Sequence, residues 1–438
     1  MQAAENIAGM NDVAPIKLSV IHVKGKKTLR ICLLGYRSHP YCGGQGIYIK
    51  YLSKALVETG HAVDVISGEP YPELDPRVRL IKMPGLNLFE APNRFTALRL
   101  QDLKSFTNMF EWFSMLTGGF PEPYTFGRRV SKYLGSHLHH YDLIHDNQSL
   151  STGLLSLQKN GVPVVATIHH PITRDMEIAL AAAPNLKHRL LIRRWHSFLR
   201  MQKKVVQKLN HLVTVSECSR RDIAQAFGVT EQNINLVYNG IDTKEFAPMP
   251  EIVRMPYRIM TTASADQPLK GLKYLLKAIA ALMPRYPDLN LLVIGKPKSD
   301  GYTEKLIKRL KLETTVTFVS GIKTEHIVRY YAEATMAVVP SLYEGFGLPA
   351  GEAMACAVPV ISTDGGALSE VVGNAGIQVP TGDTKALILA ITELLESPTK
   401  RRQLGEAGRQ RILDKFCWTV AARQMTNYYH RVLNNADH

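Results

Sequence analysis

The sequence has no long hydrophobic run. Among its longest apolar stretches are VPVVATI at 162–168 and MAVVP at 336–340, which are far shorter than the ~20 residues that a membrane-spanning helix needs. An integral membrane protein is therefore excluded. Residues 1–27 contain no apolar segment ahead of a small-residue cleavage site, so we expect a loosely ordered extension without a secretion signal.

Cysteine is also scarce. The 438 residues include 5 cysteines, and no two of them form a C-x-x-C pair. An odd and scattered set does not fit a disulfide framework or a zinc site, and it favours a reducing, cytoplasmic compartment. The five are Cys32, Cys42, Cys218, Cys356 and Cys417.

Acidic residues are too few to balance the basic ones. The chain has 53 Lys and Arg against 38 Asp and Glu, a net charge of +15 and a pI near 9.5. Such a balance indicates an anionic partner, which is nucleic acid, an acidic membrane surface or a phosphorylated substrate. A nucleic-acid-binding protein is the least favoured of these, because the sequence contains no recognised RNA- or DNA-binding module.

What the chain does contain is a regular alternation of short apolar runs and amphipathic helical patterns. This alternation predicts parallel sheets built from βαβ units. It is interrupted at the proline-rich segment 243–257 and then starts again, so we expect two doubly wound, Rossmann-like α/β domains that face each other across a cleft. The expected parts are an extension at 1–27, a first domain at 28–243, a second at 244–418, and a helix at 419–438 that crosses back to the first.

The strongest local pattern is PSLYEGFGLPAGEAMA at 340–355. Glu344 and Glu352 stand on either side of a glycine-rich turn, and Pro349 suits the first turn of a following helix. Free N–H groups at such a helix start can bind phosphate, and the two carboxylates can accept hydrogen bonds from sugar hydroxyls. The plain alternative is an ordinary strand–loop–helix connection with two solvated glutamates.

This segment resembles the signature of the family-4 retaining glycosyltransferases, which have the GT-B fold. Further segments match the family in order and spacing, so the resemblance runs from about residue 29 to the C-terminus. It is specific for the fold and the donor chemistry, and much less so for the acceptor. The further segments are GGQGIYIKYLSKAL, SECSRRDI, NGIDTKEF, LKGLKYLLKAI, PVISTDGGALSEVV and VPTGD.

The resemblance implies roles in binding a nucleotide-sugar donor. Glu352 matches the residue that holds the ribose hydroxyls, Glu344 the one that contacts the transferred sugar, and Lys270 the lysine on the diphosphate. That lysine would neutralise the charge that develops on the leaving nucleotide. The backbone amides of Gly345, Phe346, Gly347 and Leu348 would cover sugar and phosphate, and Gly295 and Ile322 would belong to the donor pocket. Taken alone, Lys270 is an ordinary solvated residue at a helix start.

In the first half, Gly43 and Gly44 belong to a glycine turn that the resemblance places opposite the donor phosphates. The pattern is weak by itself, since many strand–helix connections contain one. His169 matches the family histidine beside the reactive face of the sugar, although its neighbour His170 is an alternative. A histidine at a strand end is as often simply structural.

The chain departs from the family at one position. Relatives often have an arginine six residues before the lysine, where this chain has Ser264. A serine brings no charge, so either Lys270 and helix-end amides hold the diphosphate alone or another basic residue substitutes. We expect activity to survive.

No D-x-D pair occurs in the sequence, so we expect no metal and no cofactor beyond the nucleotide-sugar substrate. The family transfers sugar with retention at the anomeric carbon. No carboxylate is clearly placed as a nucleophile, and the family's usual account is a same-face substitution in which the leaving phosphate accepts the proton of the acceptor.

Residues 178–216 contain no Asp or Glu, and the pattern within them predicts one basic helix over 186–209. It would either dock on an anionic membrane or pack on the sheet with a solvated basic face. If the helix docks on a membrane, the aromatic stretch 107–126 would line an apolar acceptor groove. If it packs on the sheet, the aromatic stretch would be ordinary core packing. Membrane docking would suit a lipid or lipid-linked glycan acceptor.

Together these features predict a metal-independent retaining glycosyltransferase that moves a hexose-type sugar from a nucleotide-sugar to a glycan or lipid acceptor, either in the cytoplasm or at the inner membrane surface. The alternatives are a nucleotide-sugar epimerase or hydrolase of the same architecture, and an inactive scaffold. The presence of Lys270, Glu344 and Glu352 argues against the scaffold.

Overall fold

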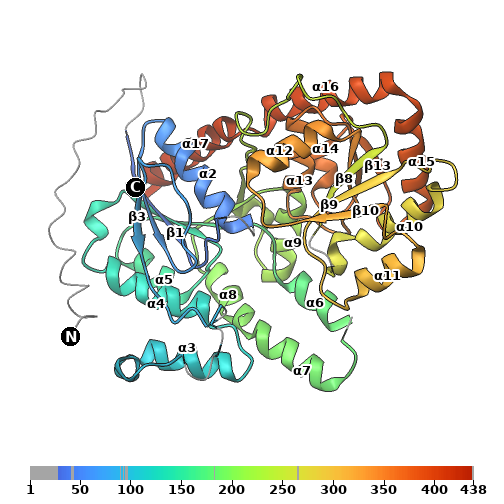
Figure 1. Ribbon diagram of the computed structural model, residues 1–438. Helices are drawn as coiled ribbons and strands as arrows, with labels where there is room; N and C mark the ends of the chain where they lie inside the picture. The colour runs from blue at the N-terminus through green and yellow to red at the C-terminus, as the bar shows by residue number, and fades with distance from the viewer. Residues whose placement is uncertain are drawn as a thin grey trace.

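The computed structural model describes residues 28–40, 44–88, 90–91, 93, 97–181, 183–263 and 266–436. Among these residues, none of the helices is long and apolar enough to cross a membrane. The described chain forms two parallel sheets that lie side by side, one in the blue-to-green part of Figure 1 and one in the yellow-to-red part. This arrangement agrees with the two rounds of strand–helix alternation in the sequence.

The first sheet has seven strands in the order β3-β2-β1-β4-β5-β6-β7. Its central strands are buried along their length because helices cover both faces, which explains their continuous apolar sequences. The strands are β1 (Arg30–Gly35), β2 (Ala62–Ser67), β3 (Arg79–Lys82), β4 (Leu143–Asn147), β5 (Val164–Ile168), β6 (His211–Thr214) and β7 (Ile234–Leu236).

The helices of this half lie between successive strands in the chain. They are α2 (Gly44–Glu58), α3 (Phe106–Leu116), α4 (Glu122–Leu134), α5 (Thr152–Lys159), α6 (Thr173–Ala181), α7 (Leu186–Trp195), α8 (Leu199–Val206) and α9 (Glu217–Phe227). Short 3-10 turns lie at η1 (Leu100–Lys104), η2 (Leu138–His140), η3 (His196–Phe198) and η4 (Glu231–Asn233).

The second sheet has six strands in the order β10-β9-β8-β11-β12-β13. They are β8 (Arg258–Thr262), β9 (Asn290–Ile294), β10 (Val316–Val319), β11 (Met336–Val339), β12 (Val360–Thr363) and β13 (Ile377–Val379). The helices are η5 (Pro268–Lys270), α10 (Leu272–Leu282), α11 (Tyr302–Leu310), α12 (Thr324–Glu333), α13 (Leu348–Ala355), α14 (Leu368–Val372), α15 (Thr384–Glu396), α16 (Pro398–Lys415) and α17 (Trp418–Ala436). The three-residue edge strands β7 and β13 were not predicted, because so short a run carries little periodicity.

The chain passes between the two halves twice. The first passage is the segment after β7, and the second is the start of α17, which returns to lie along α2 (Figure 1). The two passages touch where Ile241 pairs with Cys417 in an isolated parallel bridge. Apolar side chains of α17, among them Trp418 and Tyr429, share one core with β1 and α2.

One sequence prediction was wrong. The single helix expected over 186–209 is broken into α7, the 3-10 turn η3 and α8. Trp195 and Phe198 on either side of the break both contact the ring of Phe120, at centroid distances of 5.1 Å and 5.5 Å. Both rings pack on Phe120 across the segment in which the 3-10 turn replaces the α-helix.

Candidate active site

Lys270 and Glu344 meet at the carboxyl edge of the second sheet. Lys270 ends the turn after β8, Glu344 lies in the loop after β11, and the lysine Nζ is 2.8 Å from Glu344 Oε1. The Ser341 hydroxyl donates to the same oxygen over 2.7 Å. The structure thus brings together the two residues that the sequence assigned to diphosphate and sugar.

A glycine makes this approach possible. Gly271 follows the lysine with φ +63°, and a Cβ at this position would lie 1.8 Å from the carbonyl oxygen of Pro340. No side chain fits so close to backbone, and the left-handed conformation is itself unfavourable for other residues. The K-G pair of the motif therefore allows the lysine turn to pack against the end of β11.

The glycine-rich turn leads into the N-terminus of α13. Gly347 adopts φ +101° immediately before the helix begins at Leu348, so the positive end of the helix dipole faces the region of Glu344. The preceding residue, Phe346, is buried and its ring contacts Phe416. Its side chain belongs to the core, and only its backbone is free to cover a ligand.

Glu352 lies one turn further along α13, in a partly buried site. Burial, together with the nearby carboxylate of Glu245, raises the pKa of Glu352 to about 8. Glu245 comes from the passage between the two halves and accepts a hydrogen bond from the Tyr51 hydroxyl of α2. Sequence reasoning missed this second carboxylate, because Glu245 is more than a hundred residues away from Glu352 in the chain.

His169 lies at the end of β5 and takes part in a chain of hydrogen bonds with Asn147 and Gln45. Its Nε2 is 2.7 Å from Asn147 Oδ1, and Asn147 Nδ2 donates to the carbonyl of Gln45 over 3.1 Å. Since an amide oxygen only accepts, Nε2 carries the proton and Nδ1 is the acceptor. Burial lowers the pKa of His169 to about 3, so the ring is neutral.

His170 has different surroundings from His169. Its Nε2 is 3.0 Å from Asp175 on α6, and both side chains are about one-third exposed. It is therefore in a partly exposed pair, whereas His169 packs edge-on against Tyr48 with ring centroids 4.7 Å apart. This difference supports the choice of His169 that the sequence had left open.

The two halves of the protein touch directly at these residues. A Cβ on Gly345 would lie 3.0 Å from the carbonyl oxygen of His169. The Ser219 hydroxyl on α9 lies 2.8 Å from the His169 carbonyl oxygen and 3.1 Å from that of Gly345, and Ser216 donates to the latter over 2.7 Å. Ser219 thus fixes the turn beside Glu344 against the strand that ends at His169.

A second contact secures α9 to the other half. The carboxylate of Glu370 on α14 accepts from the backbone N–H groups of Glu217 and Cys218 at 2.8 Å and 2.7 Å. A carboxylate at a helix N-terminus is favourable for both the unpaired N–H groups and the helix dipole. The family segment SECSRRDI, to which the sequence assigned no role, therefore connects the two halves.

The remaining predicted donor residues are placed as follows. Gly295 follows β9 and Ile322 follows β10, so both lie at the same edge of the second sheet as Lys270. Gly44 begins α2 with open space around it, whereas a Cβ on Gly46 would lie 2.1 Å from the His39 carbonyl oxygen. Gly46, which was not singled out, is therefore the glycine that this turn requires. Gly43 and Ser264 lie outside the described residues.

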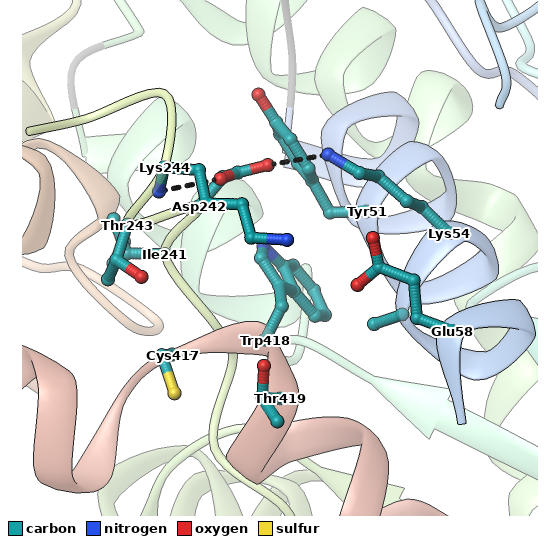
Figure 2. Close-up of a pocket in the computed structure, with 11 residues that line it drawn as sticks. Tyr51, Lys54, Glu58, Ile241, Asp242, Thr243, Lys244, Cys417, Trp418 and Thr419 are labelled. Carbon is teal, nitrogen blue, oxygen red and sulfur yellow. Dashed lines mark hydrogen bonds and ion pairs between the residues drawn. The ribbon is translucent and has the colours of Figure 1, made fainter.

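A pocket lies where the two passages between the halves meet α2. Figure 2 shows Tyr51 and Lys54 of α2 facing Asp242 of the first passage and Trp418 of the second. Lys54 Nζ is 3.0 Å from Asp242 Oδ2, and the rings of Tyr51 and Trp418 stack at 6.0 Å. Helix α2, which begins near the candidate site, is thus attached to both passages.

Comparison with known proteins decides the family. The family described as "Glycosyl transferases group 1" matches residues 249–411, and "Glycosyltransferase Family 4" matches residues 42–245. The chain is 44% identical to the MMP alpha-(1->4)-mannosyltransferase of Mycolicibacterium hassiacum over 409 residues, which covers 92% of this chain and 98% of the relative. The chain belongs to the group 1, family-4 glycosyltransferases. The family resemblance drawn from the sequence is confirmed.

More distant relatives agree with this assignment. D-inositol 3-phosphate glycosyltransferase 2 of Catenulispora acidiphila is 26% identical over 435 residues, covering 93% of this chain and 96% of that protein. The sucrose-phosphate synthase of Thermosynechococcus elongatus superposes with a TM-score of 0.68 at 25% identity, covering 93% of this chain and all of that one. The predicted GT-B fold is confirmed, and the chain is a nucleotide-sugar-dependent glycosyltransferase.

The bridging position of Ser219 gives a testable expectation. Ser219→Ala removes the hydroxyl between the two carbonyls, and we expect sugar turnover to fall about fivefold because a hydrogen bond contributes about 1 kcal/mol. The matched control is Ser53→Ala, since Ser53 is equally buried but bonds only to the Lys50 carbonyl of its own helix. Initial-rate kinetics and melting temperatures of both variants provide the measurement. Wild-type turnover in Ser219→Ala would contradict a positioning role.

Proposed function

We propose that this glycosyltransferase is a metal-independent, retaining hexosyltransferase that moves mannose from a nucleotide donor to a glycan. The 44% identical relative is named as an alpha-(1->4)-mannosyltransferase, which supports mannose as the sugar and an α-linked product. The observation that carries the proposal is the meeting of Lys270 and Glu344 beside the turn that contacts His169.

Lys270 supplies the positive charge in this proposal. Its ammonium pairs with Glu344, and each of these side chains is less than one-third exposed. On donor binding the ammonium moves to the diphosphate, where the N-terminus of α13 also favours negative charge. Glu344, released from the lysine, then accepts hydrogen bonds from hydroxyls of the transferred sugar. Neither step needs a metal ion.

The transfer itself follows the same-face course. The bond between the anomeric carbon and the diphosphate oxygen breaks, and the acceptor oxygen bonds to the carbon from the same side. The acceptor proton passes to the leaving phosphate oxygen, and the nucleoside diphosphate departs. His169, neutral at physiological pH, contacts the sugar as a hydrogen-bonding group and adds no charge that would compete with the developing oxocarbenium ion.

The first test is a screen of nucleotide-sugars by thermal shift, followed by product analysis with and without acceptor. We expect a nucleotide-linked mannose to raise the melting temperature by mass action. Lys270→Gln should lose most of the shift and about a hundredfold of the turnover, whereas Lys277→Gln, an exposed lysine of α10, should keep both.

Different outcomes identify the rival reactions. Release of free mannose at the same rate with and without acceptor would indicate a hydrolase, and an altered nucleotide-sugar would indicate an epimerase. Absence of any shift with every donor would contradict the proposal.

The raised pKa of Glu352 predicts a pH dependence of donor binding. Ribose hydroxyls donate to a carboxylate, but below pH 8 the free protein holds Glu352 in its neutral form. Donor binding must then release a proton, so affinity should rise by up to tenfold per pH unit between pH 6 and 8 and level off above. A nucleotide-sugar is the appropriate probe, because its diphosphate does not titrate in this range.

Calorimetric titration at several pH values measures this dependence. Glu352→Gln should bind weakly and without pH dependence. Glu245→Gln removes the carboxylate that helps to raise the pKa of Glu352, so the levelling point should move to lower pH. Equal wild-type affinity at pH 6 and pH 8 would contradict the assignment of Glu352 to the ribose.

A second proposal concerns location, and the surface of α3 and α7 supports it. Among the described residues, none of those in α7 is buried. Leu186 and Leu190 are 78% and 63% exposed, and Phe106 and Phe113 of α3 are 66% and 63% exposed. Basic side chains of α7 accompany these apolar groups, a combination that suits an anionic membrane surface. The alternative was that this basic segment packs on the first domain. Its second part, α8, does so, because Leu199 and Val206 are buried there.

Co-sedimentation with vesicles tests this docking. We expect recovery with phosphatidylglycerol vesicles and not with neutral phosphatidylcholine vesicles. Leu190→Asp should reduce the recovery, whereas Leu389→Asp, an equally exposed leucine of α15 in the second domain, should not. Equal recovery in the supernatant with both lipids would overturn the proposal.

A further inference from the structure

Four polar side chains lie in two pairs at the carboxyl ends of neighbouring strands of the first sheet. His145 and Asn147 alternate along β4, and Thr167 of β5 alternates with His169 just beyond the strand. The register places Asn147 beside Thr167, and side chains two residues apart lie on the same face of a sheet. The four groups therefore share one face, where Tyr48 of α2 contacts Thr167 and His169.

The first pair, His145 and Thr167, is bonded entirely within the protein. His145 Nε2 is 2.7 Å from Thr167 Oγ1, and His145 Nδ1 bonds to the Tyr429 hydroxyl of α17. The Tyr48 hydroxyl lies 3.2 Å from Thr167 Oγ1. Because both ring nitrogens of His145 have partners, this pair offers no group to a substrate and supports the second pair beside it.

The second pair is Asn147 and His169. The buried side chain of Asn147 uses both ends of its amide, since Nδ2 donates to the Gln45 carbonyl over 3.1 Å and Oδ1 is 2.7 Å from His169 Nε2. The bond to Gln45 fixes which end of the amide is the oxygen, so His169 Nε2 carries the proton. An apolar side chain would fill this place without the cost of burying an amide, so packing alone does not explain an asparagine here.

The backbone of His169 is held by the next residue, Gln148. Its Oε1 accepts from the His169 N–H over 2.7 Å, and its Nε2 donates to the His170 carbonyl over 3.0 Å. Gln148 and Leu150 have φ +57° and +48°, a conformation that side chains of this kind rarely adopt. The buried Asp146 carboxylate stabilises this turn by accepting from the Leu150 N–H over 3.0 Å. Backbone strain of this kind is concentrated at functional sites.

One nitrogen of the His169 ring has no partner. Among the residues that the structure describes, none forms a hydrogen bond with Nδ1, whereas Nε2 is bonded to Asn147 and the ring packs edge-on against Tyr48. The carbonyl of the same residue contacts the Gly345 turn, which follows Glu344. A neutral ring with its proton on Nε2 offers Nδ1 only as an acceptor, so its partner must be a group that donates, such as a hydroxyl.

We propose that Asn147 is a positioning residue for sugar transfer, which holds the His169 ring with its proton on Nε2 so that Nδ1 accepts from a hydroxyl of the transferred sugar. The proposal rests on the proposed function, in which His169 contacts that sugar. Asn147 acts through the ring and does not touch the substrate. A ring that turned over, or that gained a second proton, would no longer offer an acceptor at this place.

Two substitutions separate the hydrogen bonds of Asn147. Asn147→Leu keeps a similar volume and loses both bonds, whereas Asn147→Asp keeps an acceptor for Nε2 and loses only the donation to Gln45. We use GDP-mannose as the donor probe and methyl α-mannoside as the acceptor probe, at pH 8. Asn147→Leu should lower the kcat for donor consumption about ten- to hundredfold, because the Nε2 proton is left without a partner. Asn147→Asp should stay within about threefold of the wild type.

Binding of GDP alone gives the matching control on the nucleotide. GDP lacks the sugar and so does not reach His169, and its Kd, measured by calorimetry, should be the same in the wild type and in both variants. A loss that appears in kcat and not in this Kd separates positioning of the ring from damage to the fold.

The pH profile of Asn147→Asp is a readout that a merely structural role would not move. A carboxylate beside Nε2 favours the imidazolium, so it should raise the pKa of His169 from about 3 toward about 6. An NMR titration of ring-labelled histidine measures this pKa, and His169→Gln assigns the signal. The kcat of Asn147→Asp at saturating donor should fall with pH along the same ionisation, while the wild-type kcat stays level. Saturating donor removes the effect of Glu352 on donor binding.

The other titratable groups around the ring are the same in the wild type and in Asn147→Asp. They are Tyr48 of α2, His145 of β4, the adjacent His170, and Glu344 of the turn that contacts His169. A difference between the two pH profiles therefore comes from the residue at position 147.

Asn235→Leu is the matched control variant. Asn235 of β7 also accepts from a cationic N–H group, that of Arg431 over 3.1 Å, and donates to a backbone carbonyl, that of Leu236 over 3.5 Å. Its kcat should equal that of the wild type. Wild-type kcat in Asn147→Leu, an equal loss in Asn235→Leu, an Asn147→Asp variant as impaired at pH 8 as Asn147→Leu, or a kcat of Asn147→Asp that does not follow the ionisation of His169 would each overturn the proposal.

These outcomes are distinguishable from failure of the proposed function. In each of them a wild type that consumes the donor leaves sugar transfer in place. A wild type that binds and consumes no nucleotide-linked mannose refutes the proposed function itself, and the NMR titration then still shows whether position 147 contacts the His169 ring.

Discussion

The contact between the Gly345 turn and the end of β5 is the constraint on which the rest of the site depends. Each sheet alone presents only half of the necessary groups, with lysine and carboxylates on one and the histidine on the other. Ser219 and Ser216 hold the two backbones together at this point, and Glu370 secures the helix that carries both serines. These links are hydrogen bonds, each of which contributes about 1 kcal/mol, and the apolar side chains of α17 add a shared core between the halves.

The ionisable side chains of the candidate site carry little net charge. Lys270 is paired with Glu344, burial holds Glu352 protonated at neutral pH, and His169 is uncharged. In the proposed complex, a phosphate of the donor takes the place of Glu344 beside Lys270, and sugar hydroxyls take the place of Lys270 beside Glu344. The basic surface on α7 is a different part of the fold from this centre, so the proposed membrane docking and the proposed donor binding involve different residues.

The sequence predicted the features that arise from contiguous residues. Strand, glycine turn and helix start are all encoded within 336–355, and so the placement of Glu344 before α13 followed from local physics. The two parallel sheets were predicted from the alternation of strand and helix patterns alone. Three-residue strands such as β7 were not predicted.

Features that depend on distant residues could not be predicted. Glu245 approaches Glu352 only because the chain passes between the domains beside α13, and Ser219 reaches Gly345 only in the assembled fold. The break in the helix at 196–198 lies where two aromatic rings contact Phe120, some 75 positions earlier in the chain.

The central claim is that Lys270 and Glu344 hold the two parts of one nucleotide-sugar, the lysine on the diphosphate and the carboxylate on the sugar. A crystal structure of the protein with a non-hydrolysable nucleotide-mannose analogue tests it most directly. We expect Lys270 Nζ to leave Glu344 and lie within hydrogen-bond distance of a phosphate oxygen, while Glu344 contacts sugar hydroxyls opposite His169. An analogue bound elsewhere, with the 2.8 Å pair between Lys270 and Glu344 intact, would contradict it.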